Sequence, residues 1–334
     1  MSKPSKRHHY LPQSYQNGFA GEDGLVSLFD RETKTFRRQQ PLNTALETHF
    51  YTVTDKEGRK SDGLERVFAG LDGVGSRVIS RRDAGQFEWE NAEQRTSFAI
   101  FIAFLYCRTP AFDKEQTALA EQMYRAFMKA DNATADVTAK LWEERAKQDG
   151  EEFDMEAVKA FFEMVQEDNY AVDVPREYIL RVMTEAALHL AEVVLTMNWV
   201  FVFAPPGLAF ITSDAPFFIA PPPGMENDSR AYGILTPGAA ATIPLSSRTC
   251  LIMEGQGGTE RHGKISKDGA RRINENIAKN SDRFIIGRDQ IYLERLVKRT
   301  RVGQFRWTSR FEFNIGEIDG DLLFHTKRAR PPSD

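Results

Sequence analysis

The chain has 334 residues, of which 41% are hydrophobic and 28% are charged, and it carries 24 phenylalanines and a net charge of -4. This composition excludes an intrinsically disordered chain and is typical of a globular protein with a sizeable core. The two cysteines, Cys107 and Cys250, lie far apart, which excludes a disulfide framework and a Cys-x-x-Cys metal site and predicts a cytoplasmic protein.

Apolar runs along the chain are short. The longest, from Phe98 to Cys107, has ten residues, whereas a membrane-spanning helix needs ~20. The first residues, Met1–Ser5, lack the apolar segment of a signal peptide. The sequence therefore predicts no membrane association.

Charge is unevenly distributed along the chain. Residues 113–173 carry 16 acidic and 7 basic residues, whereas residues 256–334 carry 17 basic and 11 acidic residues. The basic excess predicts a surface for phosphate-rich ligands, although the interspersed acids favour an ordinary solvated surface. The acidic helices at 113–173 offer a third interpretation, a scaffold that uses them as a partner surface and forms oligomers whose size changes with salt.

The first part of the chain predicts a short arm and a hairpin. A short helix is expected after Pro12, and strand-like runs at 25–29 and 35–38 flank a turn-prone segment, which is typical of a β-hairpin. A polar loop then leads to a helix over about 61–79. Further helices are expected at 93–107, 111–130, 135–148, 154–168 and 175–197.

The pattern changes to strands at Trp199. Apolar runs at 199–203 and 208–212 are separated by Pro205-Pro206-Gly207 and predict a second hairpin. The remaining expected elements are strands at 240–244 and 249–253, a helix at 267–281, a strand at 284–286, a helix to Lys298 and an aromatic segment at 305–307.

These elements predict an α+β fold. A helical central body, about 61–197, is flanked by small antiparallel β elements at about 25–39 and 199–253. We expect one large domain over 1–334. It is divisible into an N-terminal arm with the hairpin (1–60), the helical body (61–197) and a β-rich and helical C-terminal part (198–334).

Several sequence blocks occur in a characteristic order. They are Lys6–Tyr15 with Phe19, Glu47–Tyr51, Glu65, Arg108–Pro110, Thr212–Pro216 and Pro244–Ser246. Together they resemble domain-of-unknown-function family 4238, which is found mainly in bacteria, over roughly residues 6–286. The resemblance implies a fold family and a set of positions, and no settled reaction. The chain departs from the family at Ser14-Tyr15-Gln16, where an aromatic residue followed by Tyr and Leu is usual, so we expect different packing around that helix.

Two adjacent histidines, His8 and His9, stand at the start of the first block. Adjacent side chains diverge by about 100° in a helix or 180° in a strand, so both do not easily bind one metal. If His9 faces inward, Tyr10 and Gln13 complete a polar cluster in which a neutral imidazole is a general base. The alternative is that His and Tyr hydrogen-bond to the backbone and hold the arm on the body.

Three carboxylates are the candidate partners. Glu47 and Glu65 are two of them. If Glu47 is buried it needs a cationic partner, and Arg108 is the candidate, either for chemistry or as a structural ion pair. Asp214 follows a hydrophobic strand, where it is either presented at a sheet edge or makes a turn with Ser213. Asn274 either reaches the same region or is solvated.

Other signatures give little support to known chemistries. The chain has no GxGxxG, GxxxxGK[ST], HExxH or GxSxG motif, so dinucleotide binding, P-loop hydrolysis, zincin chemistry and α/β-hydrolase chemistry lose their usual support. Glu185, His189 and Glu192 share a helical face, but a second matching set is missing, which favours a solvated face over a metal site.

The resulting hypothesis is a polar pocket between the N-terminal arm and the body. Its expected lining is His9, Tyr10, Gln13, Glu47, Tyr51, Glu65, Arg108, Ser213 and Asp214. In the hydrolytic, nuclease-type version, typical of bacterial defence proteins, His9 is the general base, Glu47 or Asp214 orients it or holds a divalent ion, and Arg108 neutralises an anionic, phosphate-bearing substrate such as nucleic acid. In the rival version the same residues form a structural core or a non-catalytic ligand or sensor site. The metal and the oligomeric state stay open.

Overall fold

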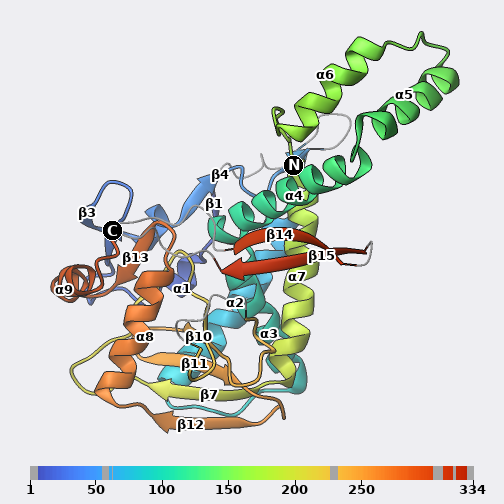
Figure 1. Ribbon diagram of the computed structural model, residues 1–334. Helices are drawn as coiled ribbons and strands as arrows, with labels where there is room; N and C mark the ends of the chain where they lie inside the picture. Colours follow the sequence, from blue (N-terminus) through green and yellow to red (C-terminus); the bar gives the residue numbers. More distant parts are fainter. Residues whose placement is uncertain are drawn as a thin grey trace.

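The computed structural model describes residues 7–54, 60–61, 63–225, 232–303, 311–318 and 321–328. The fold is α+β, as predicted, with long helices in the middle of the chain and small sheets built from its two ends (Figure 1). Among the described helices, none combines the length and apolarity needed to cross a membrane.

The N-terminal arm is tied to the body by short strands. β1 (Arg7–His9) pairs with β4 (Leu46–Thr48) in antiparallel register, and the short α1 (Gln13–Asn17) follows β1. The predicted hairpin is confirmed as β2 (Val26–Asp30) and β3 (Thr35–Gln39). A 3₁₀ turn covers Pro41–Asn43, and the small pair β5 (Val53–Thr54) and β6 (Lys60–Ser61) precedes the helical body.

The helical body contains α2 (Gly63–Asp83), α3 (Ala92–Cys107), α4 (Pro110–Asp131), α5 (Ala135–Asp149), α6 (Met155–Gln166) and α7 (Arg176–Thr196). These confirm the predicted helices to within a few residues at each end. α3 lies at the centre because its second half is apolar on nearly every face. α2 approaches it closely at Gly75, where a Cβ atom would lie 2.5 Å from the ring of Phe101.

Part of the helical body leaves the core. The outer part of α4 together with α5 and α6 projects from the rest of the molecule (Figure 1). This projection coincides with the acidic segment 113–173. Several of its large apolar side chains are exposed, among them Tyr124, Phe127 and Leu141.

A five-stranded sheet lies under the helices, in the order β12-β7-β11-β10-β9. Its strands are β7 (Asn198–Phe203), β9 (Phe218–Ala220), β10 (Ala240–Pro244), β11 (Thr249–Glu254) and β12 (Glu260–Lys264), and only the β12–β7 pair is parallel. Trp199 and Phe201 face the helical core, whereas Val202 belongs to a second core with α8. Both faces are therefore covered, which explains the continuous apolar run of β7.

The predicted hairpin of 199–203 with 208–212 is wrong. β7 pairs with β11 and β12, and the chain after Pro205-Pro206-Gly207 leaves this sheet. The N–H of Phe210 bonds to the carbonyl of Ser247, and Phe210 is buried in the second core. The sequence pattern could not distinguish a strand of this sheet from the buried extended segment that follows Gly207, because both are continuously apolar.

A four-stranded sheet, in the order β3-β2-β13-β8, joins the two ends of the chain. β8 (Thr212–Ser213) pairs with β13 (Phe284–Gly287), and β13 pairs with β2. α8 (Lys267–Asn280) and α9 (Gln290–Thr300) pack together with this sheet in the second core. β14 (Phe311–Ile318) and β15 (Asp321–Arg328) form a hairpin, and the predicted aromatic segment 305–307 lies outside the described residues.

Candidate functional site

His8 is the histidine that faces the interior. Its side chain is fully buried, and its ring stacks on that of Tyr51 with centroids 5.6 Å apart. Its Nδ1 accepts a hydrogen bond of 2.8 Å from the backbone N–H of Tyr51. Because a nitrogen that accepts a hydrogen bond carries no proton, the imidazole is the neutral tautomer with its hydrogen on Nε2. His8 therefore attaches the N-terminal arm to the loop after β4.

Arg108 approaches the same place from the end of α3. It is buried, its Nη2 donates to Oδ1 of Asp72 at 2.7 Å, and its carbonyl accepts a hydrogen bond of 2.9 Å from the Tyr51 hydroxyl. Its guanidinium carbon lies 5.3 Å from the centre of the Phe68 ring. An arginine held by a carboxylate and an aromatic ring in a desolvated place is strongly positioned. We call His8, Tyr51, Phe68, Asp72 and Arg108 the arm cluster.

Glu65 lies beside the arm cluster on α2. Glu65, Phe68 and Asp72 follow each other at intervals of three and four residues, so they share one face of the helix. Desolvation raises the pKa of the Glu65 carboxyl, while the positive charge of Arg108 opposes the increase. The predicted proximity of Tyr51, Glu65 and Arg108 is thus present.

Glu47 lies elsewhere, and the expected Glu47–Arg108 pair is wrong. Glu47 is exposed on β4. Partial desolvation raises the pKa of its carboxyl, Lys114 opposes the increase and Asp113 adds to it. Arg108 is paired with Asp72 from α2 instead, and the charged groups that act most strongly on Glu47 are Lys114 and Asp113.

Two further residues predicted for the pocket point away from the arm cluster. His9 is half-buried, and its Nε2 lies 3.0 Å from the carbonyl oxygen of Leu42, to which it can donate. Gln13 is exposed, whereas Gln16 is buried and donates to the carbonyl of Leu11 at 2.9 Å. The hypothesis placed the imidazole of His9 inward, and the structure places that of His8 there, because strand β1 sends neighbouring side chains to opposite sides.

Asp214 anchors the start of β13. Its Oδ1 accepts from the N–H of Asp282 at 2.9 Å, and its Oδ2 accepts from the N–H groups of Arg283 at 2.6 Å and Phe284 at 2.9 Å. The hydroxyl of Ser213 accepts from a backbone N–H two residues further on. Both side chains are buried. Ser213 thus makes the local turn that the sequence offered, whereas Asp214 bonds the distant backbone of residues 282–284 and not its own turn.

The Asp214 carboxyl has unusual electrostatics. Burial raises its pKa to about 6, the neighbouring Asp282 adds to the increase, and the three backbone N–H groups oppose it. Asp282 in turn accepts from Nζ of Lys114 at 2.6 Å. Burial also raises the pKa of Tyr10, with contributions from the Asp214 and Glu47 carboxylates. Tyr10 is thus within electrostatic range of Asp214, and its ring also packs on Phe50, with centroids 6.2 Å apart.

The predicted lining is thus divided between two places. The arm cluster contains Tyr51 and Arg108 with Glu65 beside it, whereas Ser213 and Asp214 lie at β8 and the start of β13. Tyr10 packs on Phe50, which in turn contacts Tyr51. Within the described ranges, no group of three or more His, Cys, Asp and Glu side chains is arranged to hold a metal ion. Glu185, His189 and Glu192 are exposed on α7. The assigned roles of His9, Glu47 and Asp214 stay predictions.

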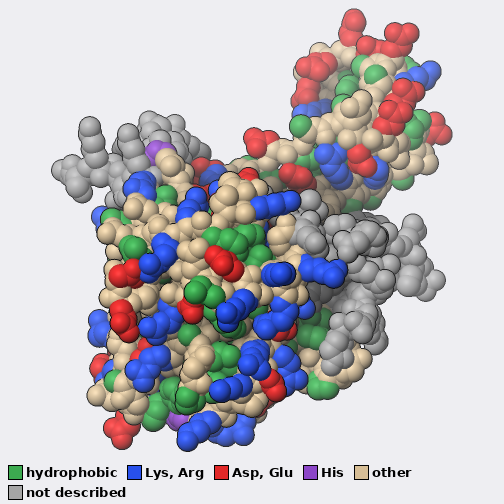
Figure 2. Space-filling model, turned by 90° about the vertical axis from the view of Figure 1, so that its left-hand side faces the viewer, with side chains coloured by type: hydrophobic (Ala, Val, Ile, Leu, Met, Phe, Trp, Pro, Cys, Tyr) green, Lys and Arg blue, Asp and Glu red, His purple; other side chains and the backbone are tan. Residues whose placement is uncertain are grey.

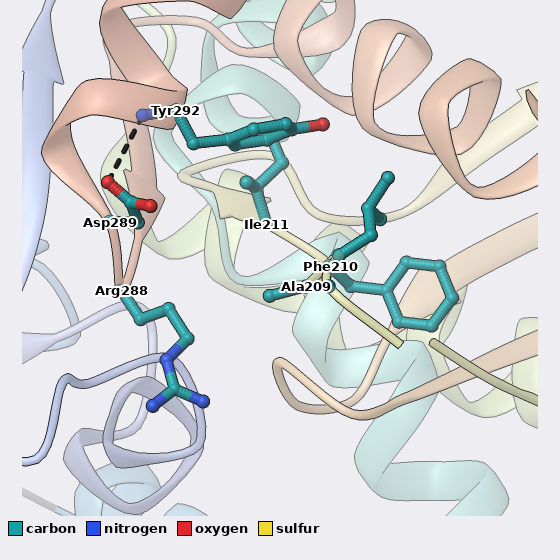
Figure 3. Close-up of a pocket in the computed structure, with 8 residues that line it drawn as sticks. Ala209, Phe210, Ile211, Arg288, Asp289 and Tyr292 are labelled. Carbon is teal, nitrogen blue, oxygen red and sulfur yellow. Dashed lines mark hydrogen bonds between the residues drawn. The ribbon is translucent and has the colours of Figure 1, made fainter. Parts of the chain in front are cut away.

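A pocket that the sequence did not reveal lies between the segment after β7 and the start of α9. It measures about 300 Å³ and is lined by Gly207, Leu208, Ala209, Phe210, Ile211, Arg288, Asp289 and Tyr292. Figure 3 shows the ring of Tyr292 and the guanidinium group of Arg288 in different parts of this lining. Volumes of this order are at the lower end for small-molecule sites.

Asn274 on α8 holds the walls of this pocket together. It is fully buried, and its Nδ2 donates at 2.8 Å to both the carbonyl of Ala209 and the hydroxyl of Tyr292. Its Oδ1 accepts from the N–H of Ile211 at 3.1 Å. Asn274 was expected near Asp214 or in solvent, and the structure places it here instead. A polar residue within the apolar stripe of an amphipathic helix was the available signal.

The pocket borders a strongly basic part of the molecule, to which its lining residue Arg288 also belongs. Between residues 264 and 301 the sequence has eleven Lys and Arg against five Asp and Glu. Figure 2 shows the side that carries α8, α9 and β3, where Lys and Arg side chains gather. The exposed members are Arg37, Arg38, Arg271, Arg272, Arg288, Arg295, Lys298 and Arg299, which we call the basic face.

Several cations of the basic face have no partner of opposite charge among the described residues. Arg38 pairs with Asp23 and Arg299 with Glu275. By contrast, Arg272, Arg288, Arg295 and Lys298 form no ion pair with any residue that the structure describes. Their charge is therefore available to an external anion.

Comparison with known proteins gives a match to a protein family. A family model described as "Protein of unknown function (DUF4238)" matches residues 7–290. No curated protein and no solved structure matches the chain.

Proposed function

Because the chain belongs to the DUF4238 family of proteins of unknown function, which carries no assigned reaction, we propose its function from its surface: it is a non-catalytic module that binds nucleic acid through the basic face. The observation that carries the proposal is the collection of unpaired cations on one side of the molecule (Figure 2). Phosphate contacts by Lys and Arg supply most of the affinity in sequence-independent nucleic-acid binding.

The arrangement on α9 supports this proposal. Arg295, Lys298 and Arg299 are spaced by three and four residues and therefore share one side of the helix. Arg288 precedes the same helix and is exposed. A row of cations along one helix matches the regular charges of a phosphate backbone better than scattered surface charges do.

The buried polar residues support binding over turnover. Arg108 is committed to Asp72 and a carbonyl bond, and Asp214 is committed to three backbone N–H groups. Groups used in this way are not free to bind a substrate without breaking bonds that hold the fold together. The non-catalytic alternative therefore has the stronger support.

The test is fluorescence anisotropy with labelled single-stranded and duplex oligonucleotides at several salt concentrations. In the double variant Arg295→Glu/Lys298→Glu we expect the affinity to fall by about ten-fold or more, with a shallower dependence on salt. The matched control is Lys140→Glu/Lys159→Glu, which changes the net charge equally but lies on the exposed acidic projection. If wild type binds neither oligonucleotide at low salt, or both double variants lose affinity equally, the proposal is wrong.

A second function, hydrolysis of a phosphate-bearing ligand, has one supporting observation. Burial raises the pKa of Asp214 to about 6, so its proton is exchangeable near neutral pH. Incubation of the protein with nucleic acids and Mg²⁺ or Mn²⁺ tests it, with His9→Ala and Glu47→Ala as variants. Turnover that disappears in these folded variants supports the hydrolytic roles, and undiminished turnover contradicts them.

A further inference from the structure

The pocket on the basic face has two chemically different parts. Leu208 and Ala209 supply half-buried apolar lining above the buried side chains of Phe210 and Ile211. Tyr292 adds an aromatic ring. Arg288 adds an exposed guanidinium that has no ion-pair partner among the described residues. Figure 3 shows that these parts come from two segments, the stretch after β7 and the start of α9.

The walls of the pocket are held rigidly. Asn274 binds the carbonyl of Ala209, the N–H of Ile211 and the hydroxyl of Tyr292. Asp289 accepts from the backbone N–H of Tyr292 at 3.1 Å and so caps α9. Because Asn274 is fully buried, these bonds are not exchanged for water. The Tyr292 ring is therefore positioned before any ligand arrives.

We propose that this pocket receives one unpaired nucleotide, with its base against the Tyr292 ring and the apolar lining and its phosphate beside Arg288. This proposal rests on the proposed function, because it assigns a place to one nucleotide of a bound strand. An aromatic ring accepts the flat face of any base, and a guanidinium matches the shape and charge of a phosphate. A duplex keeps its bases paired and stacked, so the pocket selects single strands or frayed ends.

The experiment compares a single-stranded oligonucleotide with a duplex of the same length. We expect Tyr292→Ala to lower the single-strand affinity by about five-fold or more, the size that loss of one stacked base gives, and to leave the duplex affinity unchanged. Tyr292→Phe keeps the ring and should retain the single-strand affinity. Tyr124→Ala, which removes an exposed tyrosine from the acidic projection, is the matched control.

Competition identifies the chemistry of the pocket. A nucleoside monophosphate in excess should displace the single strand and not the duplex, whereas inorganic phosphate at the same ionic strength should displace neither selectively. If the nucleoside monophosphate no longer displaces the single strand from Tyr292→Ala, the proposal is supported. This holds even if the variant is less stable, provided that its melting temperature stays above the assay temperature.

The outcomes separate the two proposals. If Tyr292→Ala binds single strands as wild type does, while Arg295→Glu/Lys298→Glu loses binding, the nucleotide pocket is wrong and the basic face is still supported. If a single strand and a duplex bind equally and the monophosphate displaces neither, the pocket proposal is again wrong. If wild type binds no nucleic acid at low salt, both proposals are wrong.

Discussion

The arm cluster and the basic face use the same kinds of side chain for opposite purposes. In the arm cluster the guanidinium of Arg108 is buried against Asp72 and Phe68. On the basic face Arg295 is exposed and has no ion-pair partner among the described residues. A buried charge needs its partner to offset the loss of water, whereas an exposed one is free to meet a ligand. The difference shows that family blocks can mark places where the fold is held together.

The charges of the two regions differ in the same way. Within the arm cluster the positive charge of Arg108 is balanced by Asp72, with Glu65 nearby. Over residues 264–301 bases exceed acids by eleven to five. Balanced charge in the interior stabilises a structure, and unbalanced charge at the surface attracts a polyanion.

The largest expected effect comes from removing the guanidinium of the arm cluster. We expect Arg108→Ala to lower the free energy of unfolding by about 3–5 kcal/mol, because it leaves Asp72 without its partner and opens a space beside Phe68. Urea denaturation followed by circular dichroism measures it. The matched substitution on the basic face, Arg295→Ala, should change the same quantity by less than about 0.5 kcal/mol. Equal effects of the two substitutions would erase the contrast between the regions.

The next effect is a dependence on pH at Asp214. Its pKa is raised to about 6 by burial and by Asp282, so the folded protein binds more protons than the unfolded chain between about pH 4 and pH 6. The resulting stabilisation is complete below this window and is lost as the pH rises through it. Relative to Asp214→Asn, wild type should gain about 2–3 kcal/mol between pH 7 and pH 4.

Chemical denaturation at both pH values measures this difference. Asp289→Asn is the control on the basic face, because Asp289 is exposed and caps α9 through a bond that an Asn oxygen also makes. A difference between wild type and Asp214→Asn that does not change with pH would show that this carboxyl titrates normally.

Most of the secondary structure could be predicted from the sequence. The long helices follow from their apolar periodicity and caps, as at Thr109, whose hydroxyl accepts from the N–H of Phe112. The segment 208–211 could not be placed, because burial against α8 is a tertiary effect that leaves no periodic signal. Pairing of β8 with β13 also joins residues about 70 positions apart.

The candidate site was predictable only in part. The neighbourhood of Tyr51, Glu65 and Arg108 followed from the resemblance, but the side to which β1 turns His8 depends on one residue of register. Asp72 was missed because an acid on a helix is usually solvated. The pocket at Tyr292 was missed because its polar support, Asn274, comes from a distant helix.

The smallest expected effect compares the two adjacent histidines. His8→Ala removes the acceptor of the buried Tyr51 N–H and a stacked ring, and should lower the free energy of unfolding by about 1–3 kcal/mol. His9→Ala removes a half-buried contact with the Leu42 carbonyl and should cost less than about 1 kcal/mol. Urea denaturation of both variants at pH 7 measures the difference. A greater loss of stability in His9→Ala than in His8→Ala would mean that His9 holds the N-terminal arm on the body. His8 would then have to be removed from the arm cluster, and the contrast with the basic face would rest on Arg108 alone.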